Sequence, residues 1–463
     1  RVSPKDRGTP RFQPRPRFSR SRANARAPRR PSQADTAPSS REPTLSRSSL
    51  FLFVRSLEMA AAPLQKERET FDELEAKVTD VAWLSDVLGG TRGKVVGAEL
   101  EDLSGAGGLS GARLSRLRVR YDGDGGPASC VLKARRDDLC KSFGLAREAL
   151  FFREHAGGLV EQGLAPRVYH SHGSMEAGEK WILMEDLSEA VQSGYYFGAH
   201  SPLNWGKDLS ALTATTPSTI EDVLRLSFRF AARFHARFWC ASEMRDRQWV
   251  RGSDWWRGEN RADFEAAEAR WKETWAKAKE RDEDIQWPSS VTAVLDAACA
   301  KLGWEAYSQD IAEATDGACW TLIHGDFHPA NLMLRGSELV AVDFESVGIG
   351  RGPEDLGQYM ISHLEPALRE KLERQAVQDY YDTLVSARPE IGRALSMESC
   401  WRHYIRGGIK RWAFLLPLLA TMGLPAPAVQ YFLDQFDAFV RTHVTIGGKG
   451  GAIDEALVPM PGI

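Results

Sequence analysis

The sequence predicts an α+β fold in which a small part rich in β-strands precedes a larger part built mostly from helices. Between residues 95 and 185, short apolar runs alternate with turn-forming residues, which is the pattern of strands. After Leu187 the apolar residues recur mainly at helical spacing, and the only convincing strands lie close together between residues 321 and 344. No repeat with a period of about 20–50 residues is visible, which argues against a solenoid.

The strand-rich part is expected to open with a helix over Phe71–Leu88, because apolar residues recur at helical spacing and Gly89-Gly90 follows as a stop. A second helix is expected over Phe143–His155. Asp122–Gly126 holds residues that tolerate positive φ and is expected to close a hairpin. The expected strands are Val95–Leu103, Leu114–Tyr121, Cys130–Ala134, Arg167–His172 and Lys180–Glu185.

The second part is expected to be a large helical lobe with one embedded β-hairpin. Its longest apolar stretch, Trp412–Leu424, is shorter than the ~18 residues of a membrane span and contains Pro417, so a buried helix is expected there. The other expected helices are Val223–Phe238, Arg261–Arg281, Val291–Ala314, Leu368–Ala387 and Val429–Val444. The expected strands are Thr321–His324, Leu332–Leu334 and Leu339–Phe344.

Composition and charge exclude several classes of function. The chain has 463 residues, of which 43% are hydrophobic and 27% charged, as in an ordinary globular protein. Residues 59–463 carry 46 Lys and Arg against 59 Asp and Glu, and this acidic balance argues against a nucleic-acid partner. The six cysteines show neither metal-ligand nor C-x-x-C spacing, so they are expected to be reduced thiols of an intracellular protein. No apolar run reaches the ~18 residues of a membrane span, so no membrane partner is expected. The expected location is the cytoplasm, or an organelle if residues 1–58 are a transit peptide.

Residues 1–58 differ from the rest of the chain. They are rich in Arg, Pro and Ser, with 14 basic residues against four acids, and they are too poor in apolar residues to form a core. Two interpretations compete: an organellar transit peptide, or translated upstream sequence or a fragment, with Met59 as the true start. The second is favoured, because a genuine leader should carry its own Met. The expected organisation is a leader over 1–58, a strand-rich lobe over 59–185 and a helical lobe over 186–463.

One segment carries the residues that phosphoryl transfer to a hydroxyl requires. It reads His324-Gly325-Asp326-Phe327-His328-Pro329-Ala330-Asn331 and is followed by Asp343-Phe344-Glu345. A carboxylate must orient or deprotonate the attacking oxygen, and Asp326 suits that role. Asn331 and Asp343 offer the hard oxygen ligands that Mg²⁺ prefers. A short hairpin between the two motifs would return the chain so that Asp343 faces the same space.

These motifs resemble those of the aminoglycoside phosphotransferase family and its relatives, the choline kinases and the ecdysteroid-kinase-like (CHK kinase-like) proteins. The resemblance implies the protein-kinase-like bilobal fold, with a small β-rich N-lobe and a large helical C-lobe. It makes 59–185 the N-terminal nucleotide-binding lobe and 186–463 the C-terminal helical catalytic and acceptor-binding lobe. It also implies ATP- and Mg²⁺-dependent phosphorylation of a small molecule.

The resemblance assigns roles to residues of the strand-rich part as well. In this fold a strand lysine contacts the α- and β-phosphates and a helix glutamate holds it, which matches Lys133 and Glu148. The backbone of a glycine-rich loop covers the phosphates, and Gly105, Gly107 and Gly108 occupy that place, although Ser110 stands where a third glycine is usual. The linker between the lobes, which holds adenine through its backbone, matches Met184–Leu187, with Glu185 and Leu187 as binding residues. A capped helix start is the alternative for this linker.

Several other residues are expected to have structural roles. His235 is expected to be a packed core residue, and Asp355 to cap the helix that follows it. His324 and His328 are expected to pack the catalytic loop, since no third metal ligand has suitable spacing. Half of the 14 Trp residues fall in 249–304 and are expected to belong to the core; they are Trp249, Trp255, Trp256, Trp271, Trp275, Trp287 and Trp304. A surface that binds an apolar or cationic acceptor is the alternative for them.

The function that follows is transfer of the γ-phosphate of ATP to a hydroxyl of a small molecule. A protein substrate is disfavoured, because too few residues separate Asp343 from Pro353 for an activation segment. A sugar, an amino alcohol or a sterol conjugate would fit as the acceptor, and ATP and GTP are not distinguished. The alternative is a catalytically silent nucleotide-binding or scaffold protein, which would have no need to keep all five of Lys133, Glu148, Asp326, Asn331 and Asp343.

Overall fold

The structure is a computed structural model of the chain. It describes residues 64–88, 93–103, 111–123, 125–252, 261–444 and 457–460, with side chains from residue 71 onward. The predictions for the leader 1–58, for the glycine-rich loop with Gly105, Gly107 and Gly108, and for Trp255 and Trp256 lie outside the described residues.

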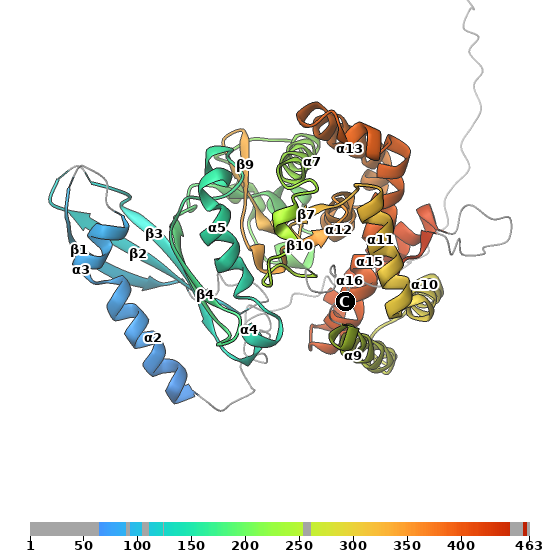
Figure 1. Cartoon of the computed structure of the whole chain (residues 1–463), viewed down its shortest axis with the longest axis horizontal. Coiled ribbons are helices and arrows are strands. Elements are labelled where there is room, and N and C mark those ends of the chain that lie inside the picture. Colours follow the sequence, from blue (N-terminus) through green and yellow to red (C-terminus); the bar gives the residue numbers. More distant parts are fainter. Residues whose placement is uncertain are drawn as a thin grey trace, which may run out of the picture. The chain divides into compact units, whose positions relative to one another are not determined.

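The N-lobe is built on a five-stranded antiparallel sheet with the order β1-β2-β3-β5-β4. Figure 1 shows this sheet, with helix α5 beside it. Each predicted strand is present within two residues of its expected bounds. The strands are β1 (Val95–Asp102), β2 (Arg113–Tyr121), β3 (Ser129–Arg136), β4 (Val168–Ser174) and β5 (Glu179–Glu185).

Two helix predictions in the N-lobe were wrong in their bounds. The expected helix Phe71–Leu88 is two helices, α2 (Leu64–Val78) and α3 (Val81–Val87), because Asp80 is extended and its side chain accepts the Trp83 N–H as an N-cap. The expected helix Phe143–His155 begins later, as α5 (Arg147–Glu161). The chain turns at Gly144, whose φ of +62° favours glycine, after the short helix α4 (Asp138–Ser142).

The C-lobe is mainly helical, as expected. The prediction of one helix over Val291–Ala314 was wrong, because the chain is extended at Leu302 and Gly303 and divides it into α10 and α11. None of the helices in the described ranges has the length and hydropathy needed to cross a bilayer. The longer helices are α7 (Ile220–Arg237), α9 (Arg261–Lys279), α10 (Ser289–Lys301), α11 (Trp304–Asp316), α12 (Pro353–His363), α13 (Pro366–Ala387), α15 (Met397–Thr421) and α16 (Ala426–His443), and the short ones are α6 (Leu209–Thr213) and α14 (Ile391–Ala394).

Two small sheets position the sequence motifs within this helical lobe. The predicted hairpin is present as β8 (Leu332–Arg335) and β9 (Glu338–Ala341), and β6 (Val191–Gln192) extends it. The expected end of the second strand at Phe344 was wrong, because Phe344–Ser346 is a 3₁₀ turn. Strand β7 (Thr321–Ile323), which leads into the first motif, pairs with β10 (Gly348–Gly350), which follows the second. Both motifs are therefore anchored at each end by strand pairing.

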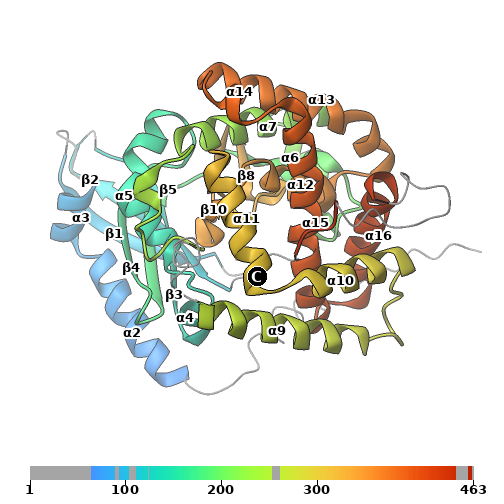
Figure 2. The ribbon, with the colours of Figure 1, turned by 45° about the vertical axis from the view of Figure 1, so that its right-hand side comes forward.

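Helices α12 and α15 cross at glycines, which allows their backbones to approach closely. A Cβ on Gly357 would lie 2.3 Å from the backbone N of Gly408, and a Cβ on Gly407 would lie 2.4 Å from the Cα of Glu354. Figure 2 shows the two helices side by side. This close packing matters because both helices carry side chains that reach Asp326 in the loop of the first motif.

The core joins the two lobes through aromatic side chains. Phe344, the middle residue of the second motif, stacks on Phe151 of α5 with ring centroids 4.7 Å apart and lies against Phe234 of α7. The five described Trp residues of the 249–304 segment are buried in this core or pack against it, as expected. All six cysteines are free, and four of them are buried.

Candidate active site

The first motif forms a tight loop between β7 and β8. Gly325 has a φ of +77°, and a Cβ at this position would lie 2.2 Å from the Ser346 carbonyl oxygen, so glycine is required. Pro329–Asn331 forms a 3₁₀ turn. His328, just before this turn, accepts the Ala330 N–H at its Nδ1 over 3.3 Å. The Asn331 amide nitrogen donates to the backbone oxygen of Asp326 at 2.9 Å and so closes the loop.

Four side chains surround the carboxylate of Asp326. Gln358 Nε2 donates to Oδ1 at 2.7 Å, and Arg411 Nη2 lies 3.2 Å from the same oxygen. The second oxygen lies 3.2 Å from Asn331 Nδ2 and 3.5 Å from His328 Nε2. Burial would raise the pKa of Asp326, but His328, Arg411 and Gln358 outweigh burial and hold the pKa well below its usual range. The group is therefore an ionised, firmly oriented carboxylate.

Asp355 fixes the backbone of the same loop, and its predicted role as a cap of its own helix was wrong. It lies inside the first turn of α12 and accepts the N–H groups of His324 at 2.7 Å and of Gly325 at 3.0 Å. His235 Nε2 lies 3.1 Å from the Asp355 carboxylate, and its Nδ1 lies 3.0 Å from the Tyr380 hydroxyl. His235 is a fully buried and satisfied core residue, as expected.

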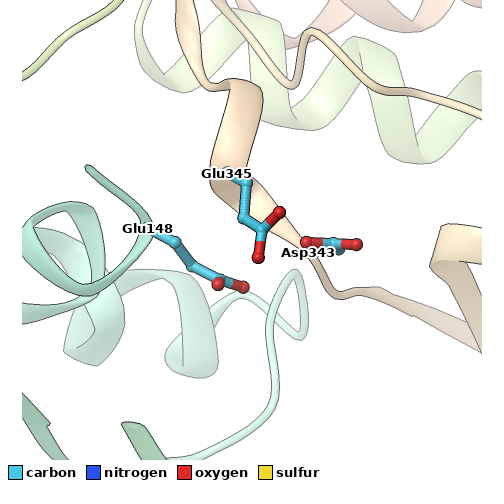
Figure 3. Close-up of side chains that lie close together, drawn as sticks. All are labelled: Glu148, Asp343 and Glu345. Carbon is cyan, nitrogen blue, oxygen red and sulfur yellow. The ribbon is translucent and has the colours of Figure 1, made fainter. Parts of the chain in front are cut away.

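The lysine and glutamate predicted in the N-lobe meet the second motif. Lys133 Nζ lies 2.8 Å from Glu148 Oε2 and 2.7 Å from Asp343 Oδ1. Figure 3 shows Glu148, Asp343 and Glu345 pointing toward one another from the two lobes. Asp343 has a φ of +66°, a left-handed conformation that aspartate tolerates better than most residues with a side chain.

Sequence reasoning missed two members of this charge cluster. Lys180 of β5 has a side chain with no exposed surface, and its Nζ lies 2.5 Å from Glu148 Oε2 and contacts Glu345 Oε1. Glu345 also lies 3.1 Å from Lys133 Nζ. The available signal was a lysine at the head of the apolar run Trp181–Met184, because a lysine in a buried strand is rare unless it is paired.

The acidic groups of the cluster fit a divalent cation. One oxygen atom each of Glu148, Asp343 and Glu345 lies within 4.8 Å of the others. Asn331 lies beside them in the fold, because its carbonyl oxygen accepts the Val342 N–H at 2.9 Å. Its amide nitrogen already donates to Asp326, which leaves the amide oxygen for a cation. Burial raises the pKa of Asp343 to about 6, with Lys133 opposing the rise and Glu345 and Glu148 adding to it.

Two arginines missed from the sequence lie beside the motifs. Arg251 Nε donates to the Ser346 carbonyl oxygen at 2.9 Å, and its Nη2 lies 2.9 Å from where a Cβ of Gly325 would be. Arg147 of α5 donates to the Glu345 carbonyl oxygen at 3.1 Å. Burial lowers the pKa of Arg251, and nearby Arg411 adds to the effect. Burial, together with Arg251, lowers the pKa of Arg147 to about 10. These groups add positive charge next to the two motifs.

The predicted linker follows β5 without starting a helix. The Glu185 N–H donates to the Arg167 carbonyl oxygen at 2.8 Å, and its carboxylate pairs with Arg335. Leu187 is half-buried and its carbonyl oxygen accepts the Ala190 N–H. Asp186 accepts from Arg116 and Ser129, so its side chain joins the linker to β2 and β3. The alternative of a capped helix start is therefore wrong, since β6 comes next.

The family of the chain follows from a comparison of its sequence. Residues 110–389, more than half of the chain, match the model of the phosphotransferase enzyme family. The chain belongs to this family. Membership confirms the resemblance that the two motifs indicated, and the sheet and helices described above are the expected kinase-like, two-lobed fold. No curated protein matches the chain.

Several solved structures are similar to this family member in fold. The choline kinase from Cryptosporidium parvum Iowa II is 9% identical, over 78% of this chain and 92% of that chain, with a TM-score of 0.44. A microcompartment-associated aminopropanol kinase is 15% identical, over 74% and 90%, with a TM-score of 0.42. Amicoumacin kinase hAmiN, in complex with AMP-PNP and Ca²⁺, is 12% identical, over 74% and 88%, with a TM-score of 0.37.

Proposed function

We propose that this protein transfers the γ-phosphate of ATP to a hydroxyl of a small molecule in the presence of Mg²⁺. One observation carries the proposal: Lys133 Nζ contacts both Glu148 and Asp343, residues 15 and 210 positions away in the sequence. A lysine and three carboxylates gathered from both lobes at one point are what a ligand site shared by the two lobes would require. Membership of the phosphotransferase family supports the same reaction class.

The residues of the cluster suggest a division of roles. Lys133, held by Glu148, is placed to bind the phosphates of ATP. Asp343 and Asn331 supply oxygen ligands for Mg²⁺, which when bound neutralises negative charge on the phosphates. Glu185 and Leu187 lie on the linker, whose backbone would bind the nucleotide base. The glycines at 105, 107 and 108 remain candidates for covering the phosphates.

Asp326 is proposed to orient the acceptor hydroxyl rather than to act as a strong base. Its low pKa makes it a weak proton acceptor, whereas its fixed carboxylate suits an accepting hydrogen bond from the hydroxyl. In a loose phosphoryl-transfer transition state the hydroxyl proton is lost late, so orientation contributes more than early deprotonation. Arg251 and Arg147 add positive charge that would favour the transferring phosphoryl group.

The test is a phosphotransfer assay on the full chain with Mg·ATP and a panel of acceptors. The panel comprises choline, ethanolamine, aminoglycosides, sugars and hydroxysteroids. Asp326→Ala is expected to abolish transfer and to leave most of the ATP affinity, whereas Glu338→Gln on the exposed side of the β8–β9 hairpin is the matched control and should transfer normally. Transfer by Asp326→Ala at the wild-type rate would refute the role of Asp326.

The metal dependence of ATP binding distinguishes the proposed function from the scaffold alternative. If the protein only binds a nucleotide, ATP affinity should be the same with Mg²⁺ and with EDTA, and no acceptor should be phosphorylated. The proposed function predicts that ATP affinity falls on removal of Mg²⁺, and falls equally in Asp343→Asn with Mg²⁺ present, because both changes remove the same cation.

A further inference from the structure

Among the described residues, the cluster between the lobes holds two lysines that differ in exposure. Lys133 has 9% of its side chain exposed and contacts Asp343, the proposed metal ligand. Lys180 has 0% exposed, and its ion pairs within the described residues are with Glu148 and Glu345 alone. Lys180 is therefore too deeply enclosed to bind a nucleotide.

Lys180 joins three separate parts of the chain. It lies near the start of β5, where it pairs with Arg135 of β3 on one side and Gly173 of β4 on the other. Glu148 belongs to α5 of the N-lobe, whereas Glu345 belongs to the C-lobe, two residues after Asp343. The ammonium group thus connects the helix that holds Lys133 to the turn that carries Asp343.

The charges of the cluster show why a second lysine is needed. Glu148, Asp343 and Glu345 carry three negative charges, and Lys133 and Lys180 carry two positive ones, which leaves a net charge of −1. Without Lys180 the net charge would be −2, and Lys133 would be the single cation for three carboxylates. Buried carboxylates without a positively charged partner are strongly unfavourable. Without Lys180, Lys133 would therefore stay paired with these carboxylates and would not be free to bind a nucleotide.

We propose that Lys180 is a positioning residue of the phosphotransfer site: it neutralises Glu148 and Glu345 so that Lys133 is free to bind the phosphates of ATP. It also keeps α5 and the Asp343 turn together. This inference rests on the proposed function, since it assumes that Lys133 binds a nucleotide.

The test uses charge-matched variants of the full chain and a fluorescent ATP analogue titrated in the presence of Mg²⁺. Lys180→Met should weaken binding of the Mg²⁺–analogue complex by at least about tenfold. The double variant Lys180→Met/Glu345→Gln loses one charge of each sign and keeps the net charge of −1. It should bind within about threefold of the wild type. Arg136→Met, which removes the exposed pair with Glu179 on the neighbouring strand, is the control and should bind as the wild type does.

Rescue by the second substitution separates positioning from a merely structural role, because a packing defect at residue 180 would persist in the double variant. Equal binding by Lys180→Met and the wild type would overturn the inference, and so would a folded double variant as weak as Lys180→Met. If thermal melting shows that Lys180→Met does not fold, the double variant alone tests the inference. Binding within about threefold of the wild type then supports it, and weaker binding by a folded double variant overturns it. A wild type that does not bind the analogue would instead refute the proposed function, and this inference with it.

Discussion

Arg411 of α15 and Asp326 of the catalytic loop form an ion pair, with Nη2 and Oδ1 3.2 Å apart. Gln358 of α12 completes a closed set of contacts, since it accepts from Arg411 Nε at 3.1 Å and donates to Asp326 Oδ1 at 2.7 Å. The orientation of the proposed catalytic carboxylate is thus set by two helices that follow it by 32 and 85 residues. The same two helices cross at Gly357 and Gly408.

Replacing Arg411 should therefore impair transfer more than nucleotide binding. In Arg411→Met the Asp326 carboxylate loses one of the two groups that hold Oδ1, and we expect kcat to fall roughly ten- to a hundredfold. The affinity for Mg·ATP should stay within about twofold, because Arg411 contacts neither Lys133 nor Asp343 in the described structure. Steady-state kinetics with the acceptor found in the panel measures both. Arg402→Met, an exposed position on the same helix, is the control.

Asp355 is expected to be essential for stability, because its buried carboxylate accepts two backbone N–H groups of the catalytic loop and contacts His235. Asp355→Ala leaves these donors unsatisfied in the core and should lower the free energy of unfolding by about 3–5 kcal/mol. Urea denaturation followed by circular dichroism measures the loss. Asp382→Asn, on an exposed face of α13, should change stability by no more than about 0.5 kcal/mol. A similar small change for Asp355→Ala would contradict the assignment.

His403 predicts a pH dependence of stability. Burial, with Arg351 and Arg406 nearby, lowers the pKa of His403 to about 3 in the folded protein, against about 6.5 in an unfolded chain. Between these two values the unfolded state binds the extra proton, so stability rises with pH and is lost as the pH falls below about 6.5. From pH 6 to pH 5, His403 should cost about 1 kcal/mol of unfolding free energy.

The measurement is the difference between the wild type and His403→Gln, because the other titrating groups then cancel. Urea unfolding at pH 6 and at pH 5 should show the wild type losing about 1 kcal/mol more than the variant over this interval. Parallel losses in both proteins would mean that His403 takes up a proton equally well in the folded and unfolded states.

Two glycine substitutions are expected to have opposite signs. Gly357→Ala places a methyl group 2.3 Å from the backbone of Gly408, which cannot move without separating α12 from α15, so stability should fall by at least about 2 kcal/mol. Gly157→Ala on the exposed face of α5 meets no atom within 4 Å and should raise stability by about 0.5–1 kcal/mol. Thermal and urea unfolding of the two variants compare them directly. A neutral Gly357→Ala would show that the two helices can separate at little cost.

Much of the fold was predictable because its signals are local. Period-two and period-3.6 apolar patterns located all five N-lobe strands and most C-lobe helices. The helix breaks near Asp80 and Gly303 were not predicted, since an apolar pattern can continue across a position where the backbone leaves the helical conformation. The hairpin between the two motifs was predicted from closely spaced strands, and it is present as β8 and β9.

The sequence by itself determined the family and the residues of the two motifs, because Asp326, Asn331 and Asp343 lie close together in one short stretch of chain, where their spacing can be read directly. Only the tertiary structure revealed Lys180 and Glu345 as partners across 165 residues, and Gln358 and Arg411 as the groups that hold Asp326. The physical reason is that a charge can be buried only beside its counter-charge, and that partner can come from any part of the chain that folding brings near.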